Sequence, residues 1–109
     1  MLQLRFQQRN GSLVVTPLVD RLDAECALEL RTQVLDQARG RRRVVLSLEH
    51  VTSMDGSGLA ALISILKAMD DGAELRLAHS SPAVQALLAR TLLDTLFPRF
   101  EDTAAAVGG

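Results

Sequence analysis

Alternating apolar and polar residues open the chain. Between residues 2 and 6, leucine and phenylalanine alternate with glutamine and arginine, which is the period of a half-buried strand. Asn10-Gly11 follows, the dipeptide most favoured in a tight hairpin turn. Residues 12–19 are then apolar on both faces, as in a strand inside a covered sheet, and Pro17 predicts a bulge or strand end because it has no N–H to donate. The pattern predicts a hairpin of two strands.

A helical period replaces this alternation after residue 23. Residues 24–39 carry apolar side chains at helical spacing, Asp23 can cap the first turn, and Gly40 can end the helix in a left-handed conformation. The apolar stripe of this predicted helix consists of Ala27, Leu30, Val34 and Ala38. Residues 44–48 are apolar apart from one serine, which predicts a central strand.

The second half of the chain repeats the order of helix and strand. A turn at residues 55–58 leads into a helix that ends before Gly72. The apolar stripe of this helix consists of Leu59, Leu62, Ile63, Leu66 and Met69. Residues 73–78 alternate like another strand, and Ser81-Pro82 opens a third helix with a capping serine and a proline at its first position. The apolar residues of the third helix are Val84, Leu87, Leu88 and Leu92.

The last residues give a weaker pattern. Residues 91–100 predict a short helical turn and a brief edge strand at 97–100, and residues 101–109 fit a short helix or a frayed tail. Strands that alternate with helices favour a parallel sheet. We therefore expect an α/β fold with a mostly parallel mixed sheet of four to five strands, and with the helices packed mainly on one face.

Size and composition fit one domain without a second core. The 109 residues are 48% apolar and 23% charged, the balance of an ordinary globular chain. Cys26 has no cysteine partner within the chain, so we expect a buried or half-buried thiol in a reducing compartment. No signal-peptide pattern opens the chain, and every apolar run is too short to span a membrane. These features predict a cytoplasmic protein that does not enter a membrane.

The charge balance argues against nucleic acid as a partner. Twelve basic and thirteen acidic residues leave a net charge of −1, and only three aromatic residues could stack on bases. Arg41, Arg42 and Arg43 form a short basic cluster that could bind phosphate, but a solvated loop is the favoured interpretation.

The run MDGSGL at residues 54–59 places the Ser57 hydroxyl between two glycines, where a strand leads into a helix. A nucleophile elbow has the form Gly-x-Ser-x-Gly, so these glycines stand at the wrong spacing. His50 and His79 are the only imidazoles that could serve as a base, and both are interpreted as loop histidines. The turn also lacks the lysine and the glycine spacing of a nucleotide-binding loop. The sequence therefore disfavours catalysis by Ser57.

Phosphorylation of Ser57 fits this position better. A phosphate adds about 1.5 to 2 negative charges beside the unpaired N–H groups of a helix start. The helix dipole would stabilise it by about 0.3 to 1 kcal/mol, partly offset by repulsion from Asp55, so the fold should tolerate the modification. In a packed interface the same dianion costs several kcal/mol to desolvate unless a cation meets it. We therefore expect phosphorylation to change partner binding.

Three long stretches carry a further signal. They are RLDAECALELRTQV, RRRVVLSLEHVTSMDGSGLAALISILKAM and AELRLAHSSPAVQALLARTLLDTLFPRFED, and their most specific parts are LDA at residues 22–24 and DGSGL at residues 55–59. Together they resemble the STAS domain, in particular the bacterial anti-sigma factor antagonists of partner-switching pathways. Because the resemblance covers nearly the whole chain, residues 1–109 would form a single STAS domain.

The resemblance implies a regulatory binding module that is not an enzyme and needs no cofactor. Its unphosphorylated form would bind an anti-sigma factor serine kinase and release that kinase's other client. The kinase, which binds the ATP, would phosphorylate Ser57, and a metal-dependent serine phosphatase would reset the antagonist. We expect a switch partner of this size to be a monomer when free.

We expect the partner-binding surface around Ser57. Asp23 and Asp55 match acidic positions of the family motifs, although each is equally well explained as a helix cap. Gly58 is expected to serve close packing or turn geometry. Ser64 and Lys67 lie further along the helix and outside its apolar stripe, on a face that a partner or solvent could cover. The predicted partner-binding residues are Asp23, Asp55, Gly56, Ser57, Gly58, Ser64 and Lys67.

Two positions depart from the family pattern. Gly56 stands where the motif commonly has a serine, which leaves one candidate hydroxyl and a more flexible turn. Asp20 replaces the glycine often found before the Arg-Leu-Asp run, so the loop ahead of the first helix is expected to differ in shape or charge. An alternative function on the same fold is a constitutive STAS scaffold subunit of a transport-related complex without phospho-switching.

Overall fold

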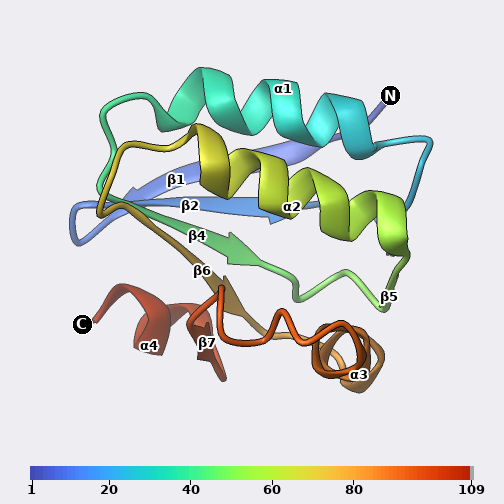
Figure 1. The fold of residues 1–109 in the computed structure, drawn as a ribbon. Helices are drawn as coiled ribbons and strands as arrows, with labels where there is room; N and C mark the ends of the chain where they lie inside the picture. The colour runs from blue at the N-terminus through green and yellow to red at the C-terminus, as the bar shows by residue number, and fades with distance from the viewer. Residues whose placement is uncertain (109) are drawn as a thin grey trace.

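Five strands form the central sheet of the computed structural model, which describes residues 1–108 (Figure 1). Their order is β1-β2-β4-β6-β7; β1 runs antiparallel to β2, and the other neighbours are parallel. Two short strands, β3 and β5, pair in parallel as a separate ladder. The strands are β1 (Leu4–Arg9), β2 (Ser12–Pro17), β3 (Arg21–Leu22), β4 (Arg43–Ser47), β5 (Ser53–Met54), β6 (Glu74–Ala78) and β7 (Arg99–Phe100). The predicted mostly parallel mixed sheet is confirmed.

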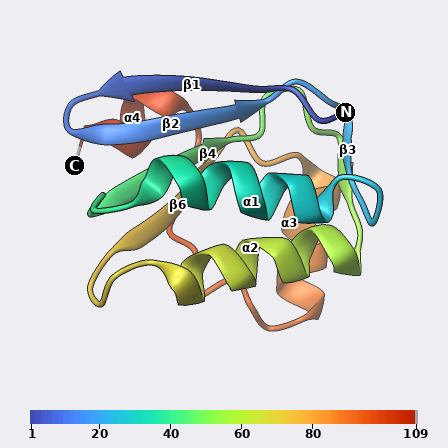
Figure 2. The same ribbon diagram turned by 90° about the horizontal axis from the view of Figure 1, so that it is seen from above.

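The helices cover the two faces of the sheet unequally. Two of them, α1 and α2, lie side by side on one face, and α4 lies on the other (Figures 1 and 2). Helix α3 stands beside β5, where the Ser81 hydroxyl donates a hydrogen bond of 3.0 Å to the carbonyl of Thr52. The helices are α1 (Ala27–Ala38), α2 (Gly56–Ala68), α3 (Pro82–Arg90) and α4 (Thr103–Val107). Residues 103–107 thus form the short helix that was one of the two alternatives for the tail, and Gly109 lies outside the described residues.

The turns form where the sequence signals predict them. Asn10 and Gly11 both adopt positive φ angles, 48° and 76°, which match the twist of a two-residue hairpin. Pro17 is the last residue of β2, as expected for a residue that cannot donate to a sheet. Gly40, with a φ of 74°, follows the end of α1.

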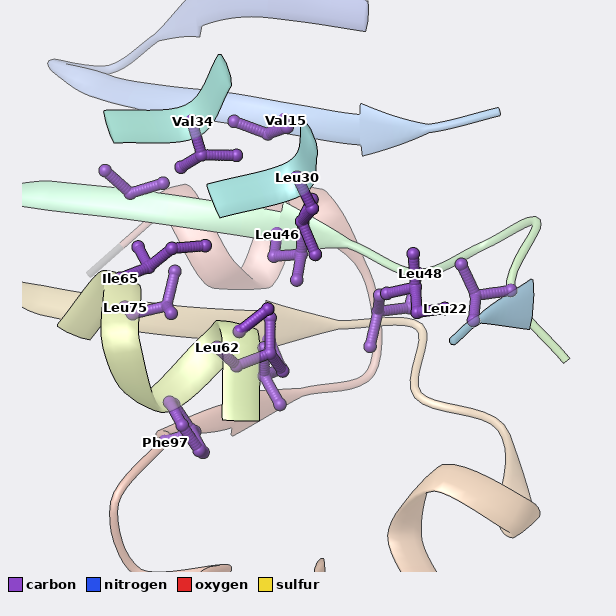
Figure 3. Close-up of a cluster of buried hydrophobic side chains, with 14 of the residues drawn as sticks. Val15, Leu22, Leu30, Val34, Leu46, Leu48, Leu62, Ile65, Leu75 and Phe97 are labelled. Atoms are coloured by element: carbon purple, nitrogen blue, oxygen red, sulfur yellow. The ribbon is translucent and has the colours of Figure 1, made fainter. Parts of the chain in front are cut away.

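The larger core lies between the sheet and the α1–α2 layer. Leu30 and Val34 of α1 point toward Val15 and Leu46 of the sheet (Figure 3). Every second residue of β2, β4 and β6 faces this layer, because side chains alternate between the faces of a sheet and paired residues share a face. The largest fully buried side chains of this core are Phe97, Leu22, Leu30, Leu46, Leu48, Leu62, Ile65, Leu75, Leu77, Leu88 and Val15.

Two predicted apolar stripes differ from the observed ones. In α2 the buried face includes Ala61 and Ile65, whereas Ile63, predicted inside the stripe, is only half-buried. At the end of α3 the prediction for Leu92 is wrong, since its side chain is 82% exposed. The helix ends at Arg90, and Leu92 adopts a φ of 58°, which turns it off the helical register.

Helix α4 covers part of the opposite face of the sheet. Ala106 and Val107 bury apolar surface there against the sheet. Arg76 is almost fully buried on the same face, where its Nη2 lies 2.9 Å from Oε1 of Glu74 and its Nη1 donates a hydrogen bond of 2.9 Å to the carbonyl of Ala106. The charge of Arg76 is therefore neutralised where it is buried, and the same guanidinium holds α4 on the sheet.

Candidate functional site

The β3–β5 ladder brings two acidic residues together from distant parts of the chain. Leu22 of β3 is paired in parallel with Met54 of β5, and Asp23 and Asp55 are the residues that follow. Neighbouring strands lie about 4.8 Å apart, so the two aspartates stand side by side at the carboxyl end of the ladder. The N–H of Asp55 donates a hydrogen bond of 3.2 Å to the carbonyl of Leu22, which ties the two segments together.

Asp55 is the N-cap of α2. Its Oδ1 accepts hydrogen bonds from the backbone N–H groups of Ser57, at 2.9 Å, and Gly58, at 3.0 Å. These bonds satisfy two of the donors that a helix start leaves unpaired. The helix consequently begins at Gly56, within the predicted turn at residues 55–58, and the Asp55 side chain remains exposed beside Ser57.

Replacing Asp55 by alanine removes both of these hydrogen bonds, and we expect the free energy of unfolding to fall by about 1 kcal/mol. The Asp55→Asn variant keeps a side-chain oxygen in the capping position and should lose less. Urea denaturation followed by circular dichroism measures both variants. Equal losses in the two would mean that the charge, and not the capping oxygen, stabilises this turn.

Ser57 presents its hydroxyl from the first turn of α2. The residue is exposed, and within residues 1–108 its side chain makes no hydrogen bond. Neither histidine is engaged with it: His50 lies 3.7 Å from the carboxylate of Glu49, and Nε2 of His79 accepts a hydrogen bond of 3.3 Å from the N–H of Thr103. The described residues therefore do not assemble a serine–histidine pair at this turn.

The two glycines of the turn have different roles. Gly58 is buried, and a Cβ at this position would collide with the backbone carbonyl of Leu22 and lie 2.8 Å from Cγ of Met54. Close packing of α2 on β3 therefore requires a glycine at position 58. Of the two roles predicted for Gly58, close packing is the one that this geometry supports. Gly56 is exposed, with no atom within 4 Å of an added Cβ. Leu59 is buried in the core, as expected.

Asp23 does not cap α1, which corrects one of the two predicted roles of this residue. Its Oδ1 accepts a hydrogen bond of 3.0 Å from the N–H of Glu25, and its carbonyl accepts from the N–H groups of Cys26 and Ala27. These bonds form a turn ahead of the helix, so that α1 begins only at Ala27 and has no side-chain cap. The half-buried Cys26 thiol lies in this turn, 3.6 Å from the carbonyls of Arg21 and Asp23, in agreement with the expected burial.

The two residues predicted further along α2 have different surroundings. Ser64 is half-buried between the helices, where its Oγ accepts a hydrogen bond of 2.6 Å from Nε of Arg31 in α1. Lys67 is exposed in the last turn of α2. Their contacts with a partner, like those of the other residues around Ser57, stay predictions. The hydrogen bond from Arg31 to Ser64 could not be predicted from residue spacing along α2, because this bond depends on how α1 packs against α2.

The arginine cluster lies at the other end of the central strands. Arg43 begins β4, and its Nε is 3.9 Å from Glu74 at the start of β6. Arg41 donates a hydrogen bond of 3.3 Å to Gln8 of β1, so this part of the cluster holds the edge of the sheet.

Throughout residues 1–108, no helix has the length and apolar character needed to cross a membrane. In the same range, no three histidine, cysteine, aspartate or glutamate residues are grouped so that they could hold a metal ion.

Comparison with known proteins assigns the chain to one family. The sequence profile of the STAS domain matches residues 3–106. An anti-sigma F factor antagonist from Paenibacillus polymyxa is 30% identical over 110 residues, which cover 97% of this chain and 92% of that protein.

Solved structures of other proteins share the fold. An anti-sigma-factor antagonist (STAS) domain protein from Planctomyces limnophilus superposes with a TM-score of 0.86 at 22% identity, over 98% of this chain and 96% of that chain. The Bacillus cell fate determinant SpoIIAA in its phosphorylated form superposes with a TM-score of 0.61 at 18% identity, over 96% of each chain. Together with the profile match, which spans nearly the entire sequence, these findings show that the chain belongs to the STAS domain family.

Proposed function

We propose that this protein is an anti-sigma factor antagonist that binds an anti-sigma factor serine kinase until Ser57 is phosphorylated. The observation that carries the proposal is the exposed Ser57 hydroxyl at the start of α2, beside the carboxylate of Asp55. The identity with an anti-sigma F factor antagonist supports the class of partner. The phosphorylated form in which SpoIIAA was solved supports a phosphate as the switching group on this fold.

The proposed cycle has three steps. The unphosphorylated protein binds the kinase and releases the other client of that kinase. The kinase transfers the γ-phosphoryl group of its own ATP to the Ser57 hydroxyl, with loss of the hydroxyl proton, and leaves ADP. A serine phosphatase then hydrolyses the phosphoester and restores the binding form. In this cycle the protein is a cytoplasmic binding module and the substrate of two enzymes, and it is a monomer when free.

The position of Ser57 lets a phosphate act on binding without unfolding the domain. The side chain is exposed, so the phosphate stays hydrated in the free protein, and the helix start favours negative charge. The Asp55 carboxylate already accepts from the N–H groups of Ser57 and Gly58, so the phosphate does not need those donors for the helix to form. In the complex with the kinase, the phosphate, Asp55 and Asp23 would be buried as neighbouring negative charges, which weakens binding.

Phosphorylation can be tested directly with kinases of the anti-sigma type. We expect mass spectrometry to locate one phosphate on Ser57 after incubation with the cognate kinase and ATP. The Ser57→Ala variant should stay unmodified and still bind, whereas Ser57→Asp should bind at least about tenfold more weakly, since about 1.4 kcal/mol of added repulsion and desolvation is enough. Isothermal titration calorimetry measures both affinities.

Ser53→Ala provides a matched control, because Ser53 is a half-buried serine of β5, four residues before Ser57. This variant should be modified at Ser57 like the wild type. A phosphate elsewhere, or a Ser57→Asp variant that binds as tightly as the wild type, would contradict the switch. If the protein binds a partner stably and Ser57 is never phosphorylated, the alternative of a constitutive scaffold subunit would be favoured.

A further inference from the structure

Leu28 is a large apolar side chain that the fold leaves uncovered. It lies in the first turn of α1 and is 72% exposed. The face of α1 that packs on the sheet is formed instead by Leu30, Val34 and Ala38. Leu28 therefore adds little to the stability of the domain. A single exposed leucine is ordinary in itself, so its meaning depends on what surrounds it.

The hydrogen bond between Arg31 and Ser64 joins α1 to α2 and relates the level of Leu28 to that of the serine turn. Both helices begin at the same end of the molecule and run side by side (Figure 2). One turn back from Arg31 on α1 is Leu28, and one turn back from Ser64 on α2 is the exposed Ala60. Ser57 is one further turn back along α2. By this spacing, Leu28 and Ala60 lie at a similar level, about one helical turn, or 5.4 Å, along the helix axis from the level of Ser57.

Acidic residues precede both helices, at the end of the molecule where Leu28 and the serine turn lie. Asp20, Glu25 and Asp55 are exposed, and Asp23 is half-buried at the end of the β3–β5 ladder. Two arginines, Arg21 and Arg31, lie in the same stretch. This end of the molecule therefore offers one exposed leucine and a set of charged side chains that is mainly negative. A protein surface with an apolar pocket and a basic rim complements it.

We infer that Leu28 is the apolar anchor by which this protein binds its anti-sigma factor kinase. The inference rests on the proposed function and adds a residue on α1 to a surface otherwise centred on α2. Leu28 enters an apolar pocket of the kinase, while the aspartates at the ladder end meet basic residues at the pocket rim. A phosphate on Ser57 lies within this same contact area and must be desolvated with it.

The inference predicts a kinetic signature. A buried apolar anchor holds a formed complex together and acts on the dissociation rate, whereas charges at a rim act mainly on the association rate. Leu28→Ala should therefore raise the dissociation rate and weaken binding about tenfold or more, with little change in association rate. Leu28→Met, which keeps the apolar volume, should bind within about threefold of the wild type. Glu25→Gln should mainly slow association.

The experiment measures association and dissociation by surface plasmon resonance with the kinase that phosphorylates Ser57, held unreactive by a non-hydrolysable ATP analogue. Leu92→Ala is the matched control, because Leu92 is also strongly exposed but follows α3 and lies on neither α1 nor α2. It should bind like the wild type. All variants should unfold at the same urea concentration as the wild type, since neither leucine is part of the core.

If Leu28→Ala binds the kinase with the same affinity as the wild type, the inference is wrong. If the kinase still phosphorylates Ser57 in that case, the proposed function is not affected. If no kinase modifies Ser57, the proposed function fails and the inference fails with it. Sedimentation of the free protein supplies the other contradicting outcome: a dimer that Leu28→Glu dissociates would make this surface a contact between two copies of the chain.

Discussion

Replacing Gly58 by alanine should lower the free energy of unfolding by about 2 to 4 kcal/mol. The added Cβ would collide with the carbonyl oxygen of Leu22, which is backbone within the β3–β5 ladder and cannot rotate away. The start of α2 must then move off β3, and the hydrogen bond of 3.2 Å from the N–H of Asp55 to the same carbonyl is strained or lost. Urea denaturation at equilibrium measures the loss.

Gly56→Ala is the matched control for this prediction. The two glycines are separated only by Ser57, but nothing lies within 4 Å of a Cβ added at Gly56, and its φ is not positive. Alanine also has the higher helix propensity, so this variant should match or slightly exceed the stability of the wild type. A Gly58→Ala variant that unfolds with the same midpoint as Gly56→Ala would mean that α2 does not pack closely on β3.

The longer elements of the fold could be predicted from the sequence because their periods are long enough to read. The hairpin, the central strands and the three longer helices each extend over at least five residues with a consistent pattern. β3 and β5 could not be predicted in this way. Each is two residues long, so neither has a period, and they form only because tertiary packing brings residues 21–22 beside residues 53–54.

The candidate site could be predicted in its members but not in its geometry. The sequence places Asp55 and Ser57 within one turn, and the N-cap role of Asp55 follows from local rules. Asp23 stands next to Asp55 because β3 pairs with β5. A separate turn lies between Asp23 and α1, because the Asp23 carbonyl accepts hydrogen bonds from the N–H groups of Cys26 and Ala27. The level of Leu28 relative to Ser57 cannot be predicted from the sequence, because it depends on how α1 lies against α2 through Arg31 and Ser64.

The fold holds the backbone of the serine turn in place and leaves the Ser57 side chain exposed. Gly58 packs closely against the backbone of β3, and the Asp55 carboxylate accepts hydrogen bonds from the N–H groups of Ser57 and Gly58. These contacts hold the backbone on both sides of Ser57 in place. The Ser57 side chain has no part in these contacts. A kinase could therefore act on the hydroxyl, and a partner could sense the phosphate, with the domain unchanged beneath it.

Phe97→Ala is expected to cause the largest loss of stability, about 3 to 5 kcal/mol. Its side chain is 1% exposed and lies beneath Leu62 of α2 in the larger core (Figure 3). The next residue, Pro98, accepts a hydrogen bond of 2.9 Å from the N–H of Leu77, so the ring also holds the segment that forms β7 against β6. Domains of this size are stable by about 5 to 15 kcal/mol, and the variant should therefore unfold at a much lower urea concentration.

Leu92→Ala tests whether this loss comes from burial and not from any truncation in the segment after α3. Leu92 is 82% exposed, so its truncation should change the free energy of unfolding by no more than about 0.5 kcal/mol.

Loss of the Phe97 ring should also release β7 and the adjoining α4, which amide hydrogen exchange would detect as faster exchange at Ala106 than at Val45 of the central strand. Similar losses in Phe97→Ala and Leu92→Ala would contradict the packing described here. The expected result would show that the Phe97 ring anchors the segment after α3 to the larger core, which also contains Leu62 of the helix that begins beside Ser57.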